Sequence, residues 1–209
     1  MQGERQVSDV ARPRRPKITP EDVALRVAGL LPDPSALIGG LAVTAHGYVR
    51  ATDDVDFVCP ADPKEIQARL GEAGMATSVR RGDILEGDIR SCVFGMLDGI
   101  RVDVLFPPVP ITWDKTVLLP LTKGSRLRVV DLDTLIRLKL RAGGPQDLLD
   151  VVHLLRRHPE MVVKAKELAA AYGLSDRLEL WLADPKIRAP ESVEATSTSR
   201  RSARRKARR

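Results

Sequence analysis

The spacing of hydrophobic residues changes near residue 125, and this change divides the chain of 209 residues into two parts. In the first part, short runs that are wholly apolar or apolar at every second position indicate strands, and they are interleaved with runs of helical period. From Val129 onward the long segments have the helical period. We therefore expect an α+β fold, with a mixed-sheet core at 20–125 and a helical subdomain at 126–187.

The predicted elements follow one another closely along the chain. The strand segments are 35–40, 54–60, 76–82, 89–97 and 100–107. The helical segments are 19–34, 41–47, 62–74, 131–143, 145–158, 159–173 and 175–184. Thr19 and Pro20 are typical of a helix start, and Asp98-Gly99 is typical of a tight turn between antiparallel strands.

Composition indicates an aliphatic core. Hydrophobic residues make up 43% of the chain but aromatic residues only 3%, so Leu, Val, Ile and Ala must fill most of the core. No apolar run reaches the roughly 18 residues of a membrane span, and the N-terminus has no hydrophobic signal segment. Cys59 and Cys92 have no metal-binding cluster around them, which predicts reduced thiols in or near the core. We expect a cytoplasmic protein without membrane contact.

Positive charge is concentrated at the C-terminal end. The net charge is +6, yet residues 200–209 carry seven Lys and Arg and no acid, and without them 27 basic residues stand against 28 acidic ones. We expect segments 1–19 and 188–209 to be disordered, because the first is polar and proline-containing and the second has no apolar periodicity. The basic tail either contacts RNA or DNA through phosphates, with strong salt dependence, or is a dispensable extension.

Two glycines follow the first predicted strand and precede a short helix. Gly39 and Gly40 allow a sharp turn and a close approach of the backbone to a ligand, and the N-terminus of the helix that we expect from Leu41 favours phosphate. The same dipeptide is also compatible with a plain turn between a strand and a helix.

Three aspartates lie on predicted strands. Asp54 and Asp56 point to the same side, because residues two apart in a strand share a face roughly 6.5–7 Å apart. Asp103 is the one acid in the apolar strand 100–107, and a lone buried acid is costly unless it is paired, hydrogen-bonded or bound to a metal. If the two strands are neighbours, the three carboxylates converge and can bind divalent cations for phosphoryl transfer. An ordinary amphipathic edge strand would also explain Asp54 and Asp56.

A lysine lies within the apolar stripe of the predicted helix 131–143. On a helical wheel Lys139 falls near the middle of that stripe, whereas Arg137 and Arg141 fall on the polar side. Lys139 either extends along the helix edge to reach water or points through the domain interface at a triphosphate. Asp147 lies at the border of the apolar stripe of the next helix, where it could hold Lys139 in place.

These residues together resemble the DNA-polymerase-β-like nucleotidyltransferase superfamily. The shared pattern is a strand ending in Gly-Gly, a short helix, an Asp-x-Asp pair and a third Asp on a later strand. The stretch GGLAVTAHGYVRATDDVDFV, with Gly47, Arg50 and Thr52, is most similar to the bacterial abortive-infection (AbiEii-type) toxins. That group also has a lysine, a basic-Asp pair and a second Asp, matched here by Lys139, Asp147 and Asp150. The resemblance spans roughly residues 25–160.

One residue departs from the pattern of the toxin group. Gln146 precedes Asp147 where the group has Lys or Arg. This difference weakens the match of the helical motif and leaves the glycine and aspartate motifs untouched.

The resemblance implies a metal-dependent transfer of a nucleoside monophosphate from an NTP, such as ATP or GTP, by a nucleotidyltransferase core followed by helices. It implies that Asp54, Asp56 and Asp103 are catalytic and bind Mg²⁺ or Mn²⁺. It assigns nucleotide binding to Gly39, Gly40, Thr52 and Lys139, and a supporting role to Arg50 and Asp147. The acceptor could be RNA or protein, and a toxin would have a cognate antitoxin.

A second hypothesis assigns the same fold to a different class of protein. A nucleotidyltransferase-like domain could serve as a nucleic-acid or partner binding module without catalysis, anchored by its basic tail. The intact set of three aspartates favours the enzyme, because a binding module does not need acids at metal spacing on buried strands.

Overall fold

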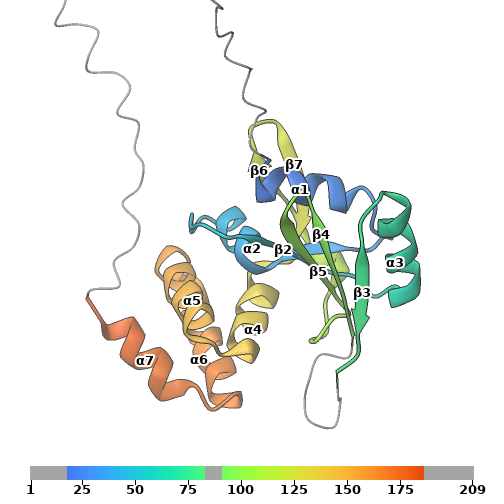
Figure 1. The fold of residues 1–209 in the computed structure, drawn as a ribbon. Helices are drawn as coiled ribbons and strands as arrows, with labels where there is room; N and C mark the ends of the chain where they lie inside the picture. The colour runs from blue at the N-terminus through green and yellow to red at the C-terminus, as the bar shows by residue number, and fades with distance from the viewer. Residues whose placement is uncertain (1–17, 83–90, 186–209) are drawn as a thin grey trace, which may run out of the picture.

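One mixed sheet forms the core of the computed structural model, which describes residues 18–82 and 91–185 (Figure 1). Within these residues the sheet has seven strands in the order β3-β4-β5-β2-β1-β7-β6. The strands are β1 (Ala36–Ile38), β2 (Asp54–Val58), β3 (Thr77–Arg80), β4 (Cys92–Leu97), β5 (Ile100–Leu105), β6 (Val117–Thr122) and β7 (Ser125–Val129).

Two of the strand pairs are parallel. β2 pairs with β5 and β1 pairs with β7 in parallel, while the other neighbours are antiparallel. The parallel pair β2/β5 sets Asp56 directly opposite Asp103. The condition under which the sequence predicts three converging carboxylates is therefore met.

Helices cover the sheet and extend beyond it. They are α1 (Pro20–Ala28), α2 (Gly39–Ala45), α3 (Pro63–Glu72), α4 (Leu132–Ala142), α5 (Pro145–Arg157), α6 (Val162–Ala171) and α7 (Ser175–Ala183), with short 3-10 turns at Trp113–Lys115 and Pro159–Met161. α3 packs against β3 and β4, and α2 packs against β1, β2 and α4. Figure 1 shows α4 to α7 gathered on the left, on the opposite side of the molecule from α3.

Local sequence explains where the helices begin and end. Thr19 caps α1, because its hydroxyl accepts the Asp22 N–H while the Asp22 carboxylate accepts the Thr19 N–H at 3.0 Å. Asp131 caps α4 in the same way by accepting the Thr134 N–H. α4 ends at Gly143, which has φ of 64°, a left-handed conformation that glycine adopts without strain.

Aliphatic side chains fill the core, as the composition requires. The largest of the fully buried side chains are Leu and Ile, with Phe57 as the aromatic member. Val55 and Phe57 are buried on the opposite side of β2 from Asp54 and Asp56. Cys59 and Cys92 are free and buried, as predicted.

The α+β fold with a mixed sheet is confirmed, and the turn at Asp98-Gly99 is the one between β4 and β5. Both of its residues have positive φ, 53° and 82°, as such a tight turn requires. α2 begins at Gly39, two positions before the predicted start at Leu41.

The sequence did not predict β6 and β7. β6 contains Pro120, which is tolerated because β6 is an edge strand of the sheet. The alternating pattern of Ser125–Val129, preceded by Gly124 with φ of 87°, is the signal that could have found this hairpin. The sheet ends at Val129, within the range that the sequence assigns to the helical subdomain.

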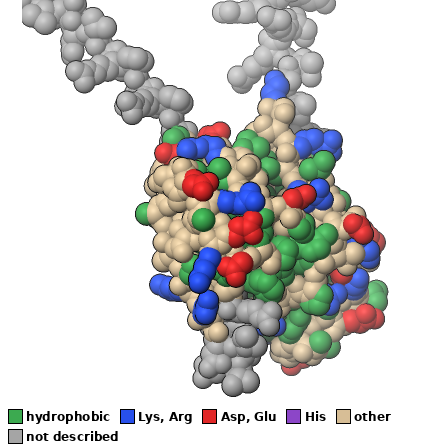
Figure 2. Space-filling view, turned by 90° about the vertical axis from the view of Figure 1, so that its right-hand side faces the viewer, with side chains coloured by type: hydrophobic (Ala, Val, Ile, Leu, Met, Phe, Trp, Pro, Cys, Tyr) green, Lys and Arg blue, Asp and Glu red, His purple; other side chains and the backbone are tan. Residues whose placement is uncertain are grey.

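Several predictions concern residues outside the described part. The disordered segments at 1–19 and 188–209 lie almost wholly there, as do residues 89 and 90 of the predicted strand 89–97. Within the described part, no helix combines the length and hydrophobicity that a membrane span requires. Figure 2 shows acidic and basic side chains interspersed over the side of the molecule on which α3 lies.

Candidate active site

Three carboxylates share one face of the sheet at the junction of β2 and β5. Asp56 lies opposite Asp103, and Asp54 lies two residues before Asp56 on the same strand. Asp103 is 7% exposed, and Asp54 and Asp56 are half-buried. The register of the two strands therefore brings together the three aspartates that the sequence singles out.

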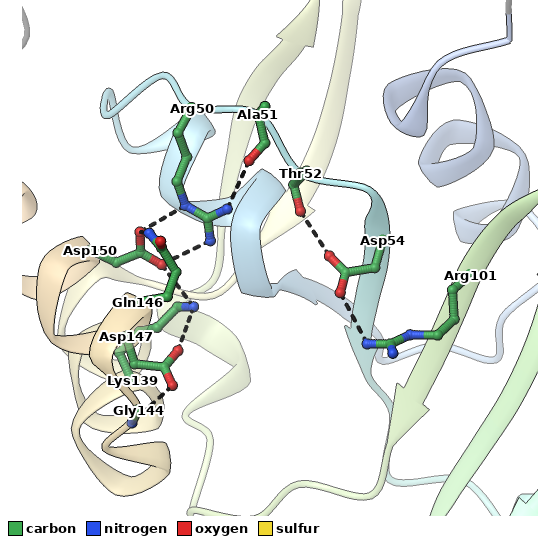
Figure 3. A network of polar contacts seen from close by, with 10 residues as sticks. All are labelled: Arg50, Ala51, Thr52, Asp54, Arg101, Lys139, Gly144, Gln146, Asp147 and Asp150. Atoms are coloured by element: carbon green, nitrogen blue, oxygen red, sulfur yellow. Dashed lines mark hydrogen bonds and ion pairs between the residues drawn. The ribbon is translucent and has the colours of Figure 1, made fainter.

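Two neighbours hold Asp54 and Asp103 in place. The Thr52 hydroxyl donates to Asp54 Oδ1 at 2.7 Å, and Arg101 Nη2 donates to Asp54 Oδ2 at 3.0 Å (Figure 3). Arg101 Nε also lies 3.3 Å from Asp103 Oδ2. Thr52, which the resemblance assigns to nucleotide binding, thus contacts a carboxylate, and Arg101 is a site residue that the sequence analysis did not identify.

The concentration of negative charge changes the acidity of the site. Burial, followed by the charges of Asp54 and Asp103, raises the pKa of Asp56 to about 7. Burial, opposed in part by the charge of Arg101, also raises the pKa of Asp103. Both shifts favour the protonated carboxyl group, and the positive charge of a cation bound beside it would oppose them.

Gly39 is required where β1 meets α2, because Asp56 lies against it. Its φ is +66°, and a Cβ on this residue would lie 1.9 Å from Asp56 Oδ2. A Cβ on Gly40 would lie 2.5 Å from Thr52 Oγ1. The Gly-Gly pair thus lets α2 approach β2 and the loop before it, so the glycines and the carboxylates form one packed unit.

A hollow of about 280 Å³ opens beside this unit. Gly39, Asp56 and Lys139 contribute to its polar part, and apolar residues such as Leu105 and Leu135 line the rest. A mainly apolar cavity with a few convergent polar groups is typical of a small-ligand site. Its position between the sheet and α4 places Lys139 on the same hollow as Asp56.

Lys139 is buried on α4 and paired with two carboxylates. It is 9% exposed, and its Nζ lies 2.8 Å from Asp147 Oδ1 and 2.9 Å from Asp150 Oδ2. Burial lowers the pKa of Lys139, but the carboxylates of Asp150 and Asp147 outweigh burial and raise it. Lys139 is therefore charged at neutral pH, and its predicted contact with Asp147 is present.

Asp150 connects the helices to the sheet. Its side chain is completely buried and accepts two hydrogen bonds from Arg50, at 2.7 and 2.9 Å, in addition to the contact with Lys139 (Figure 3). Gln146 also donates to Asp150, at 2.9 Å. Burial raises the pKa of Asp150, but these hydrogen bonds and the charge of Lys139 outweigh burial and lower it. Asp150 therefore stays ionised.

From the sequence, Asp150 is only a match to the toxin group, without a role. No periodicity could show that Asp150 joins Arg50, 100 residues earlier in the chain, because this contact exists only in three dimensions. Gln146, the departure from the group's pattern, supplies a neutral donor to a carboxylate that already has two cationic partners.

The donor set fits a hard divalent cation. Asp103 Oδ1 is buried and has no hydrogen-bond partner among the described residues, so one oxygen of the site is left to bind something else. Carboxylate oxygens are the ligands that Mg²⁺ prefers, and it often uses only one or two together with water and substrate phosphates. In the described ranges, no group of three or more His, Cys, Asp or Glu side chains is arranged so that it could hold a metal ion by itself.

Comparison with known proteins gives similarity at the level of the fold. No family model matches the sequence, and no curated protein does. Similar solved structures include ANT(2")-Ia in complex with adenylyl-2"-tobramycin, which is 14% identical with a TM-score of 0.51 over 73% of this chain and 92% of that chain.

Two further similar structures are candidate nucleotidyltransferases. The one from Thermotoga maritima is 20% identical, with a TM-score of 0.46 over 58% of this chain and 83% of that chain. The one from H. pylori is 16% identical, with a TM-score of 0.45 over 79% of this chain and 83% of that chain. The chain therefore shares its α+β fold with ANT(2")-Ia.

The contact between Gly39 and Asp56 predicts a specific effect of adding one carbon. Gly39→Ala should destabilise the protein more than Gly74→Ala, because both positions have positive φ, +66° and +81°, but a Cβ at Gly74 meets nothing within 4 Å. The strain of the positive φ is about 1–3 kcal/mol in both variants. Urea denaturation should show the additional loss at Gly39, and equal losses would show that Asp56 does not press against Gly39.

The buried ion pairs predict a large loss of stability on removal of Asp150. Asp150→Ala leaves Arg50 and Lys139 without their shared partner, which should lower the free energy of unfolding by about 3–5 kcal/mol. Asp147→Ala is the matched control, because Asp147 is 24% exposed and Lys139 keeps Asp150 when it is removed. Urea denaturation of both variants tests this, and equal losses would contradict the central place of Asp150.

Proposed function

We propose that this protein transfers a nucleoside monophosphate from an NTP to an acceptor hydroxyl, with Mg²⁺ or Mn²⁺ at Asp54 and Asp56. The observation that supports this proposal most is the placement of three carboxylates on one face of the sheet, next to a hollow that also contains Gly39 and Lys139. Carboxylates that bind a metal and a cation that meets a triphosphate are what such a transfer requires.

Each residue of the site has a definite task in this reaction. The acceptor oxygen attacks the α-phosphorus, the bond from that phosphorus to the bridging oxygen of the β-phosphate breaks, and pyrophosphate leaves. Asp103 accepts the proton of the acceptor hydroxyl, for which its raised pKa and its unpartnered Oδ1 suit it. The bound metal ion would supply positive charge to the phosphate oxygens.

Lys139 neutralises the charge of the leaving pyrophosphate. It lies on the hollow beside Gly39 and stays protonated because Asp150 and Asp147 hold it. Arg50 and Gln146 complete the set of donors around Asp150 and thereby fix the position of that carboxylate. Arg50, Asp147 and Asp150 are therefore positioning residues, which act on the reaction through Lys139.

We also propose the narrower function of an AbiEii-type toxin in the cytoplasm, acting on RNA or protein and controlled by a cognate antitoxin. Its support is the sequence resemblance, together with the fact that Lys139, Asp147 and Asp150 meet in one network. ANT(2")-Ia, in contrast, was solved with adenylyl-2"-tobramycin, so the fold is compatible with an acceptor of a different class.

The metal site predicts that nucleotide binding depends on Mg²⁺. Asp54→Asn should weaken Mg²⁺-dependent NTP binding roughly tenfold or more, since removing even an outer partner of a metal ligand costs that much. Asp53→Asn is the control, because Asp53 is the preceding residue, is exposed and lies outside the set of three carboxylates. Calorimetry with Mg²⁺ and with EDTA measures the effect, and equal heats for wild type and both variants would exclude a metal at Asp54.

Asp103 separates an enzyme from a binding module. Asp103→Asn keeps the size of the side chain but removes its charge and its basic oxygen, so transfer should fall by about 10²–10⁴ while NTP binding survives. A binding module would keep its function, and its stability would rise because a buried charge is gone.

The measurement for Asp103 is the transfer of label from each of the four NTPs to total cellular RNA and protein. Melting temperatures of wild type, Asp103→Asn and Asp53→Asn confirm that the variants are folded. Labelling by the wild type and by Asp53→Asn, but not by Asp103→Asn, supports the enzyme. Absence of labelling by the wild type with all four NTPs, together with unchanged nucleic-acid binding by Asp103→Asn, would leave the binding module as the function.

A further inference from the structure

The face of the sheet that carries the three carboxylates continues onto β4 and β3. In one row across four strands, Asp56 lies opposite Asp103, Asp103 opposite Phe94, and Phe94 opposite Ser78. In the row beside it, Asp54 lies opposite Arg101 and Arg101 opposite Met96. Since paired residues point to the same side of a sheet, an aromatic ring lies on the same face as the carboxylates, one strand away from Asp103.

This part of the face is hollowed. A hollow of about 530 Å³ is lined by Phe94, Met96, Ser78, Arg80 and Arg101, among others. It is distinct from the hollow beside Lys139, with which it shares no lining residue. The Arg80 guanidinium lies over the Phe94 ring, 5.0 Å from its centre, and Met96 is 54% exposed. The hollow thus has an apolar floor and cationic side chains.

Arg101 belongs both to this hollow and to the site. It lines the hollow, and it also contacts Asp54 at 3.0 Å and Asp103 at 3.3 Å. A ligand in this hollow therefore lies next to the carboxylate that accepts the proton of the acceptor hydroxyl in the proposed reaction. The hollow beside Lys139, where the NTP binds in the proposed reaction, lies on the α4 side of the same carboxylates. The NTP and the ligand of the second hollow would therefore meet at the aspartates.

The charges of the lining indicate which kind of acceptor fits. Arg80 and Arg101 are its two charged side chains, and none of the lining residues of this hollow is Asp or Glu. Guanidinium groups bind phosphate well, and an aromatic ring offers a surface on which a planar base can stack. A polycationic acceptor, such as an amino sugar, would be repelled by both arginines.

We propose that this hollow, formed on β3, β4 and β5, is the acceptor subsite and that it binds a nucleotide group. The Arg80 guanidinium leaves the Phe94 ring to contact the phosphate together with Arg101, the base takes its place against the ring, and the ribose hydroxyl is brought to Asp103. The proposal rests on the proposed nucleotidyltransferase function, because only a transfer reaction needs a second ligand at Asp103. The nucleotide group belongs either to the end of a single-stranded nucleic acid or to a free nucleotide.

Arg80 provides the sharpest test, because it is exposed and its replacement leaves the core intact. Arg80→Gln and Phe94→Leu in the full-length protein should each weaken binding of a fluorescent RNA tetranucleotide roughly five- to fiftyfold, as the loss of one stacking contact does. Arg81→Gln is the matched control, since it removes the same charge one residue later but lines a different hollow. It should change the affinity less than twofold.

Fluorescence anisotropy without NTP or metal measures these affinities, and unlabelled AMP is added as a competitor. If AMP displaces the label at a concentration as low as the unlabelled tetranucleotide does, the subsite binds a free nucleotide. If the unlabelled tetranucleotide displaces the label and AMP does not, the subsite binds a nucleic-acid end. Equal losses for Arg80→Gln and Arg81→Gln would show only general charge attraction and would overturn the subsite. Calorimetry of Mg²⁺ and NTP with the wild type separates this result from a failure of the proposed function, which would show as no heat of binding.

Discussion

The parallel pairing of β2 with β5 is the constraint on which the site depends. It sets Asp56 opposite Asp103 and leaves Asp54 on the same face, so the pairing of the two strands holds three acids on one face of the sheet. Burial, followed by the charges of Asp54 and Asp103, raises the pKa of Asp56 to about 7. A cation that binds beside these carboxylates would oppose the shift, and in this way the strand register supports the proposed metal site.

The rest of the molecule supports this register from both sides of β2. α2 can approach β2 only because Gly39 and Gly40 have no side chains, and Thr52 then fits between Gly40 and Asp54. On the side of the helices, Arg50 is held by Asp150 in α5, which also holds Lys139 in α4. The loop between α2 and β2 is thus tied both to the carboxylates and to the helices (Figure 3).

Much of this was predictable from local sequence, and the remainder depends on contacts between distant segments. The spacing of Asp54 and Asp56, the turn at Asp98-Gly99 and the place of Lys139 in an apolar stripe are properties of single elements. The hairpin β6–β7 was missed because Pro120 lies in β6, and a proline within a predicted strand argues against that strand. Pro120 is tolerated there because β6 is at the edge of the sheet. The sequence does not assign roles to Arg101 and Asp150, because they contact residues far away in the chain. Arg101 contacts Asp54, 47 residues earlier, and Asp150 contacts Arg50, 100 residues earlier.

Lys139 and Arg101 line different hollows, and they differ in how firmly they are held. Lys139 is buried and held by two acids, so its charge has a fixed position. Arg101 is 56% exposed and bound to Asp54 and Asp103 themselves, so a metal ion or a phosphate that binds there competes for its partners. In the proposed reaction the donor side would therefore have a rigid cation and the acceptor side an exchangeable one, because the hollow beside Lys139 is lined by α4 and the other hollow by β3, β4 and β5.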